Sequence, residues 1–162
     1  MFKKTLLIAI CGIAAIPQAA LAGITSGSMP VSALVLESCT VVATPMAFGT
    51  VVRGSVVDTS ATLVLTCTPN ADYDILLNSG GHASSGQRRL ANGAASEFIP
   101  YDLYMDSNHT QAWGNTVGTD TKAGVAGALG TATYPVYGRI PASATAVTAG
   151  AYTDTVTVTV NF

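Results

Sequence analysis

The side chains able to do chemistry in this sequence are few and widely spaced. Among 162 residues there are three cysteines and two histidines, His82 and His109. A structural zinc site takes four ligands, drawn mostly from cysteine and histidine. Cys39 and Cys67, with two histidines far away in the sequence, do not make such a set. The sequence therefore predicts no metal site.

The third cysteine, Cys11, lies in an N-terminal segment typical of a secretory signal peptide. Two lysines precede an apolar run at 5–16, and the small residues of Ala20–Ala22 suit a signal peptidase. A membrane anchor is the alternative, but the run is too short to span a bilayer. We expect residues 1–22 to be removed before Gly23.

The two remaining cysteines belong to an exported chain, and such a pair is expected to form a disulfide. Cys39 and Cys67 are 28 positions apart. Closing a loop of this length stabilises the fold by about 3.5 kcal/mol in the chain-entropy model. We predict a Cys39–Cys67 disulfide.

Catalytic patterns are missing from the sequence. His82 and His109 stand among turn-forming residues, as solvated loop histidines do, and no serine has the G-x-S-x-G context of a hydrolase. Arg88 and Arg89 read as a solvated pair at the start of a strand. Trp113 is interpreted as a core residue, with a sugar-binding platform as the alternative. We expect no enzymatic activity.

Charge and glycine content exclude two further classes of site. After removal of the signal, five basic residues stand against nine acidic ones, without a basic patch, so nucleic acid is not an expected partner. The glycine-rich stretch 124–130 lacks the G-K-[ST] of a phosphate loop. We expect no cofactor and no membrane span in the mature chain.

The elements that must position these residues are all strands. Short runs with period-two alternation recur between Gly, Asn, Ser and Pro clusters, which is typical of an antiparallel β-sandwich. The runs lie at 29–38, 60–67, 72–78, 98–106, 133–140 and 152–162, with loops at 78–87 and 122–132. The side chains expected to point inward are Leu63, Leu65, Cys67, Tyr73, Ile75, Leu77, Ile99, Tyr101, Leu103, Met105, Val136, Ile140, Val156, Val158, Val160 and Phe162.

The run with the most regular alternation is the closing one, Tyr152–Phe162. A seven-stranded immunoglobulin-like sandwich needs one more strand beside it, and no residues follow. An unpaired edge over an open apolar groove would promote aggregation unless another strand fills it. We therefore expect the sandwich to lack one strand beside this closing run.

Six ordered motifs carry a resemblance to a known family. "ESCTV" and "MAFGT" are followed by "LVLTCT", then by "PYDLYMD" and "YPVYGRI", and finally by "AGAYTDTVTVTVNF". In this order and spacing the mature chain resembles the spore coat protein U domain. That domain is the fold of subunits in archaic, Csu-type chaperone–usher pili.

The resemblance implies an incomplete immunoglobulin-like sandwich that lacks its last strand. A periplasmic chaperone would lend a strand to the groove, and after passage through an outer-membrane usher a neighbouring subunit would replace it. The domain would span 37–162 and the donor extension 23–36, running into the first strand. The residues implied are Met29, Val31, Ala33 and Val35 in the donor strand, and Val156, Val158, Val160 and Phe162 at the groove edge that the chaperone meets.

Two other functions stay open at this point. One is a spore or cell-coat structural protein that assembles without an usher. The other is a self-complete secreted sandwich that binds carbohydrate, supported by Trp113, Tyr101, Tyr104 and Tyr137 alone. The function that the resemblance implies is a pilin-like subunit of a surface fibre for adhesion or biofilm formation, exported through the periplasm.

Overall fold

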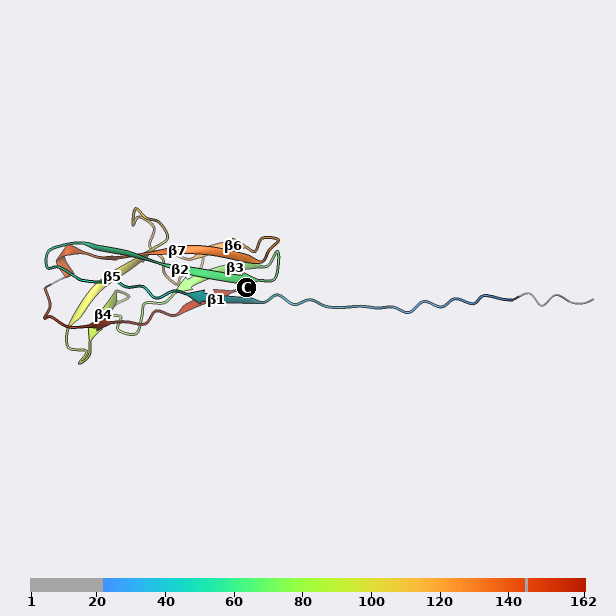
Figure 1. Ribbon diagram of the computed structural model, residues 1–162, viewed down its shortest axis with the longest axis horizontal. Coiled ribbons are helices and arrows are strands. Elements are labelled where there is room, and N and C mark those ends of the chain that lie inside the picture. Colours follow the sequence, from blue (N-terminus) through green and yellow to red (C-terminus); the bar gives the residue numbers. More distant parts are fainter. Residues whose placement is uncertain (1–21, 145) are drawn as a thin grey trace, which may run out of the picture. The chain divides into compact units, whose positions relative to one another are not determined.

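The computed structural model describes residues 22–144 and 146–162 (Figure 1). The predicted signal peptide therefore lies, apart from Ala22, outside the described residues. The chain forms two units, one that ends at Leu34 and one from Val35 to Phe162. In the first, residues 22–34 form neither helix nor strand, and their side chains are exposed. No helix in the described ranges is long and apolar enough to cross a membrane.

The larger sheet of the second unit has six strands, each antiparallel to its neighbours. In spatial order they are β1 (Cys39–Ala43), β2 (Val57–Cys67), β7 (Thr131–Ile140), β5 (Phe98–Tyr104), β4 (Arg88–Asn92) and β8 (Tyr152–Thr153). β1 is thus one edge of this sheet.

The smaller sheet is also antiparallel, with β3 in its centre. Its strands are β6 (Lys122–Val125), β3 (Asp72–Leu77) and β9 (Val158–Asn161). The one helical element of the described residues is a short 3₁₀ turn, Ala142–Ala144. The predicted all-β, antiparallel class is confirmed.

The two sheets share one apolar core, because strands of both alternate inward and outward side chains. β3 shows this most simply, with Tyr73, Ile75 and Leu77 buried between exposed or half-buried neighbours. Most of the predicted inward residues are buried. Four of them, Met105, Val156, Val158 and Val160, are half-buried against the core. Phe162 is an error in the prediction, because its side chain is 57% exposed.

Several strand boundaries differ from the sequence prediction. The run at 29–38 is not a strand, and the first strand begins at Cys39. Part of the predicted loop 122–132 is β6, an edge strand whose Gly124 lies under the Tyr73 ring. The closing run is not continuous, since β8 ends at Thr153 and β9 begins at Val158. It therefore leaves the larger sheet and joins the smaller one.

The predicted disulfide between Cys39 and Cys67 is present. The two residues face each other across the β1–β2 pair. The crosslink therefore ties the first edge strand to the core of the domain at the end where β1 begins.

Candidate functional site

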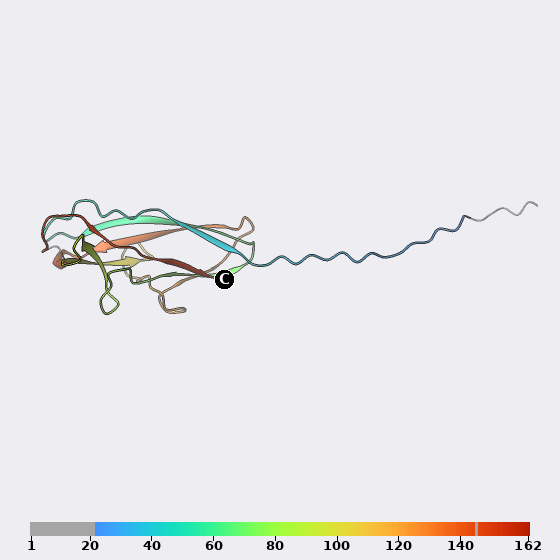
Figure 2. The same cartoon turned by 90° about the horizontal axis from the view of Figure 1, so that it is seen from below.

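Two sheet edges face each other along one side of the domain. β1 is the outer strand of the larger sheet and β9 the outer strand of the smaller one. Figure 1 shows the C-terminus beside β1, and Figure 2 shows the closing segment, in dark red, reaching the same end. Neither pairs with the other: β1 is bonded to β2, and β9 to β3.

The backbone of β1 presents unpaired polar groups on its open side. The amide of Thr44 donates to the carbonyl of Thr62, and that of Thr68 donates to Ser38. In an antiparallel pair, residues alternate between bonding to the partner strand and pointing away from it. Even-numbered residues of β1 therefore bond to β2, and Cys39, Val41 and Ala43 direct their N–H and C=O groups outward.

The backbone of the closing segment also presents unpaired polar groups, on the side that faces β1. The amide of Asn78 donates to the carbonyl of Thr157, and the Thr157 amide donates to the Asn78 side chain at 2.8 Å. By the same alternation, Val156, Val158 and Val160 point their backbone groups away from β3. Their side chains are half-buried against the core. The three predicted groove-edge valines thus lie on an open strand edge.

An apolar hollow lies between the two edges. A cavity of about 340 Å³ has Met46 and Phe48 on one side and Val156 and Val158 on the other. Its floor is made by core side chains of both sheets: Leu63, Leu77, Leu90, Tyr101, Leu103 and Val136. We call the space between residues 39–51 and residues 147–161 the groove.

The groove widens beside β8. A second cavity of about 760 Å³ has residues 46–51 and Arg53 on one side, residues 147–154 on the other, and Leu90 and Ile99 beneath. Glu97 holds the far wall in place by accepting hydrogen bonds from the hydroxyls of Tyr152 and Thr148. The two cavities share Met46, Phe48, Leu90 and Asp154, so they are continuous.

The wall after β1 depends on a glycine of β7. A Cβ atom at Gly138 would lie 2.5 Å from the Met46 sulfur and 3.0 Å from the Phe48 ring. Phe48 also packs edge-on against Tyr101, with ring centroids 5.8 Å apart. The absent side chain at Gly138 is what lets Met46 and Phe48 settle on the inner face of the sheet.

The opposite wall is fixed by Asp154, at the point where the chain changes sheets. Its carboxylate accepts hydrogen bonds from the Tyr101 hydroxyl at 2.7 Å and from the backbone amides of Gly81 at 2.8 Å and His82 at 3.2 Å. Burial of the ring and the bond to Asp154 both raise the pKa of Tyr101. Asp154 therefore links the closing segment to β5 and to the loop that follows β3.

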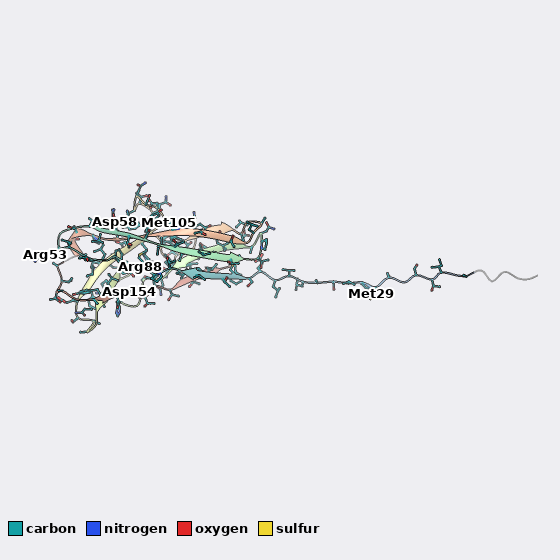
Figure 3. All side chains as sticks on the ribbon, viewed as in Figure 1. Met29, Arg53, Asp58, Arg88, Met105 and Asp154 are labelled. Atoms are coloured by element: carbon teal, nitrogen blue, oxygen red, sulfur yellow. A yellow bond between two sulfur atoms is a disulfide. The ribbon has the colours of Figure 1, made fainter. Side chains whose placement is uncertain are left out.

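Arg88 corrects the expectation of a solvated pair. Its side chain is 8% exposed, and its guanidinium donates to the carbonyls of Leu77, Asn78 and Trp113 at 2.8–2.9 Å. Burial lowers the pKa of this guanidinium. Figure 3 shows Arg88 and Asp154 in the body of the domain. The arginine ties β4 to the end of β3, beneath the closing segment.

The edges run in opposite directions. Cys39 faces Cys67, and β3 begins at Asp72, so β1 and β3 start at the same end. β9 is antiparallel to β3 and ends beside Asp74. A strand placed in the groove must therefore run parallel to one edge and antiparallel to the other.

The predicted donor residues precede β1 in the sequence and are exposed. Met29 and Val31 are 82% and 83% exposed, and both stand with Ala33 in the first unit. Figure 3 shows Met29 on an extended stretch of chain. Val35 begins the second unit and is also exposed. That these four side chains fill a groove stays a prediction.

The tryptophan and the two histidines named from the sequence are buried or half-buried. Trp113 is 1% exposed and its indole N–H donates to the Ile75 carbonyl, so it is a core residue as predicted. His109 is not solvated, because only 6% of its side chain is exposed. His82 is half-buried beside the Phe98 ring. Their loop sequences carry no signal that would have shown this burial.

Known proteins resemble this chain in both sequence and fold. The Spore Coat Protein U domain model matches residues 25–159. "Protein U" of Myxococcus xanthus is 33% identical over 109 residues, which are 64% of this chain and 59% of that protein. The chain thus spans about three fifths of the length of this relative.

Among solved structures, the CsuC–CsuE chaperone-tip adhesion subunit pre-assembly complex, from the archaic chaperone-usher Csu pili of Acinetobacter baumannii, contains a similar chain. The TM-score is 0.61 at 23% identity, over 79% of this chain and 40% of that one. At this identity the likeness concerns the fold. The family model covers most of the sequence, and it includes the motifs that carried the resemblance, apart from residues 160–162 of the last one. The chain belongs to the spore coat protein U domain family.

Proposed function

We propose that this protein is a structural subunit of a secreted surface fibre, joined to its neighbours by donor-strand exchange. The observation that carries the proposal is the groove. Two unpaired strand edges, at 39–43 and 156–160, lie on either side of an apolar hollow of about 340 Å³. A β-strand from another molecule satisfies both the hydrogen-bonding edges and the apolar floor.

The binding physics is strand addition. Backbone hydrogen bonds to both edges give affinity that grows with length, and alternate side chains enter the hollow and set the register. Four buried apolar side chains contribute about 6–12 kcal/mol gross, before the cost of ordering the incoming strand. Free energy from completing the core can thus drive exchange without a nucleotide or a metal.

The donor that we propose is the extension 23–36 of a second copy or of a related subunit. Its alternate residues Met29, Val31, Ala33 and Val35 are apolar and exposed, and a Gly- and Ser-containing lead precedes them. Leu34 and Leu36 are also apolar but lie at the even-numbered positions. The extension could therefore place apolar side chains in the groove in more than one register. The remaining residues, 37–162, would form the receiving domain.

The partners that we propose before fibre formation are a periplasmic chaperone and an outer-membrane usher. The support is family membership together with a fold shared with a chain from a chaperone–subunit complex of a chaperone-usher pilus. The chain would pass through the periplasm to the cell surface, where the fibre would serve adhesion or biofilm formation. In this role it is not an enzyme.

The test is a groove variant with a matched control. Val158→Glu places a charge on the half-buried edge, whereas Thr159→Glu places it on the exposed face of the same strand. We expect Val158→Glu to abolish capture of a peptide covering residues 23–38 and recovery with the chaperone, and Thr159→Glu to retain both. Equal binding by the two variants would contradict the groove as the binding site.

A second candidate function is a spore or cell-coat protein, favoured by the name of the family and by the relative Protein U. It uses the same fold, so the discriminating observation is the need for an usher. A coat protein would assemble outside the cell after deletion of usher and chaperone genes, and a pilus subunit would not. The carbohydrate-binding alternative loses two of its four supporting residues, because Trp113 and Tyr101 are buried, whereas Tyr104 and Tyr137 are half-buried.

A further inference from the structure

A short loop folds back over the outer face of the larger sheet, away from the groove. It runs from Met105 to Gln111, and the Met105 amide donates to the Gln111 carbonyl at 2.9 Å. The Asp106 carboxylate closes it by accepting from the amides of Thr110 at 3.0 Å and Gln111 at 2.7 Å. The loop therefore has an ordered conformation with His109 at its turn, where φ is 57°.

Within the part of the chain that the structure describes, the buried imidazole of His109 lacks hydrogen-bond partners. Its ring packs edge-on against Tyr104 and Tyr137, with centroids 5.1 and 6.3 Å apart. Both of its ring nitrogens are buried and have no hydrogen-bond partner among the described residues. Buried polar groups in proteins are almost always paired, so an unpaired imidazole calls for an explanation.

The surroundings of this ring carry an excess of negative charge. The His109 Nε2 atom lies 3.7 Å from Asp58 Oδ1 on β2, and Asp58 is bound by Arg139 of β7 through two hydrogen bonds. Asp102 of β5 and Asp106 of the loop also act electrostatically on Tyr104. Around Tyr104, the ring that His109 contacts, three carboxylates thus stand against one guanidinium. Asp58 and Met105, labelled in Figure 3, mark the sheet and loop sides of this contact.

We propose that the loop 105–111 is an acid-strengthened clasp, in which His109 takes up a proton and its Nε2–H donates to the Asp58 carboxylate. A small inward movement converts the 3.7 Å approach into a charge-assisted hydrogen bond. The bond joins the loop to β2, which the Asp58–Arg139 pair already joins to β7. This inference does not depend on the proposed function of the groove.

The two carboxylates beside the loop keep their charge in mild acid. The Arg139 guanidinium holds the pKa of Asp58 below its ordinary value, and the Gln111 amide does the same for the pKa of Asp106. Both carboxylates therefore stay ionised across the interval between about pH 8 and about pH 5. The chain has two histidines, and His82 lies in a different loop beside Phe98.

The test is hydrogen–deuterium exchange on the full exported chain in the assembly in which it is isolated, at about pH 8 and about pH 5. After correction for the intrinsic rate at each pH, the amides of Thr110 and Gln111 should gain about tenfold in protection in acid. His109→Gln and Asp58→Asn should lose this gain, while the matched variant His82→Gln should keep it.

A second measurement needs no variant. Exchange of the imidazole Cε1 hydrogen reports the protonation of each histidine in the wild-type chain, and its midpoint for His109 should coincide with that of loop protection. Equal protection at the two pH values, an undiminished gain in His109→Gln, or midpoints that differ would each overturn the proposal.

Discussion

At the scale of single residues, the polar groups inside this domain hold strands to one another. Arg88 is the strongest case, because one guanidinium bonds three carbonyls from two separate segments. Asp154 does the converse, with one carboxylate accepting from a phenol and two backbone amides. Arg88 joins β4 to the end of β3. Asp154 belongs to the closing segment and lines the groove.

We predict that Arg88→Met destabilises the domain by about 3 kcal/mol or more, because it leaves the carbonyls of Leu77, Asn78 and Trp113 unpaired. Arg89→Met should cost less than about 1 kcal/mol, since it removes a stacking contact with Phe98 and one bond to His82. Urea unfolding followed by the fluorescence of Trp113, the one tryptophan of the chain, measures both. Equal losses would mean that Arg88 has no special structural role.

Tyr134 gives a prediction about alkaline pH. Burial and, next, a hydrogen bond with the Tyr73 hydroxyl raise the pKa of Tyr134 to about 12, from 10.0 in the unfolded chain. A raised pKa means that the fold prefers the neutral phenol, so this contribution is complete below pH 10.0 and is lost as the pH rises towards about 12. Urea midpoints should therefore fall over this interval in the wild type and fall less steeply in Tyr134→Phe. Parallel curves would contradict the assignment.

At the scale of elements, the decisive feature is that each groove wall includes an irregular segment next to its edge strand. The wall after β1 rests on Gly138, and the wall before β9 rests on Asp154. The disulfide adds a third fixed point at the beginning of β1.

We predict that Gly138→Ala weakens binding of a groove-filling strand about tenfold or more, because the added methyl group displaces Met46 and Phe48. The double variant Gly138→Ala with Met46→Ala should recover part of the affinity by restoring space. Gly127→Ala is the matched control, since nothing lies within 4 Å of a Cβ atom there. Fluorescence anisotropy of a labelled peptide of residues 23–38 measures all three, and an unaffected Gly138→Ala would show that this wall is not needed.

How much of the fold could be predicted from the sequence differs between elements. β3 was predictable because Tyr73, Ile75 and Leu77 follow a strict period of two between turn-forming residues. β6 was not, because its four residues include Gly124 and lie in a glycine-rich stretch. The break in the closing run had a signal in Asp154, a charged residue on the inward parity. Its partners come from residues distant in the sequence, so only the folded chain explains it.

Some residues of the candidate site could also be predicted from the sequence, and others could not. Val156, Val158 and Val160 were predictable as an inward row, but Phe162 was not, because the last strand ends at Asn161 and leaves the ring exposed. The opposite wall was missed altogether. Met46 and Phe48 lie in no regular element, and nothing in the sequence places them opposite β9. The burial of His109 was likewise invisible, since it depends on Asp58, Tyr104 and Tyr137 meeting through strand register.

At the scale of the whole molecule, the proposal separates the chain into a part that gives a strand and a part that receives one. A head-to-tail contact of this kind does not close on itself and therefore produces fibres. Each copy must use both parts to propagate the assembly. Removing either part leaves a chain that can still make one contact, and this predicts how defective copies behave in mixtures.

We predict that a chain lacking residues 23–36 and a full-length chain with Val158→Glu each fail to polymerise alone, yet form a one-to-one complex when mixed. The first retains a groove without a donor, and the second retains a donor without a usable groove. Size-exclusion chromatography with light scattering distinguishes a capped pair from longer assemblies, and Thr159→Glu in place of Val158→Glu should restore growth from its own copies. Fibres formed by the truncated chain alone would show that residues 23–36 are not the donor. Absence of the mixed pair, with both chains folded, would show that this extension and this groove do not bind each other.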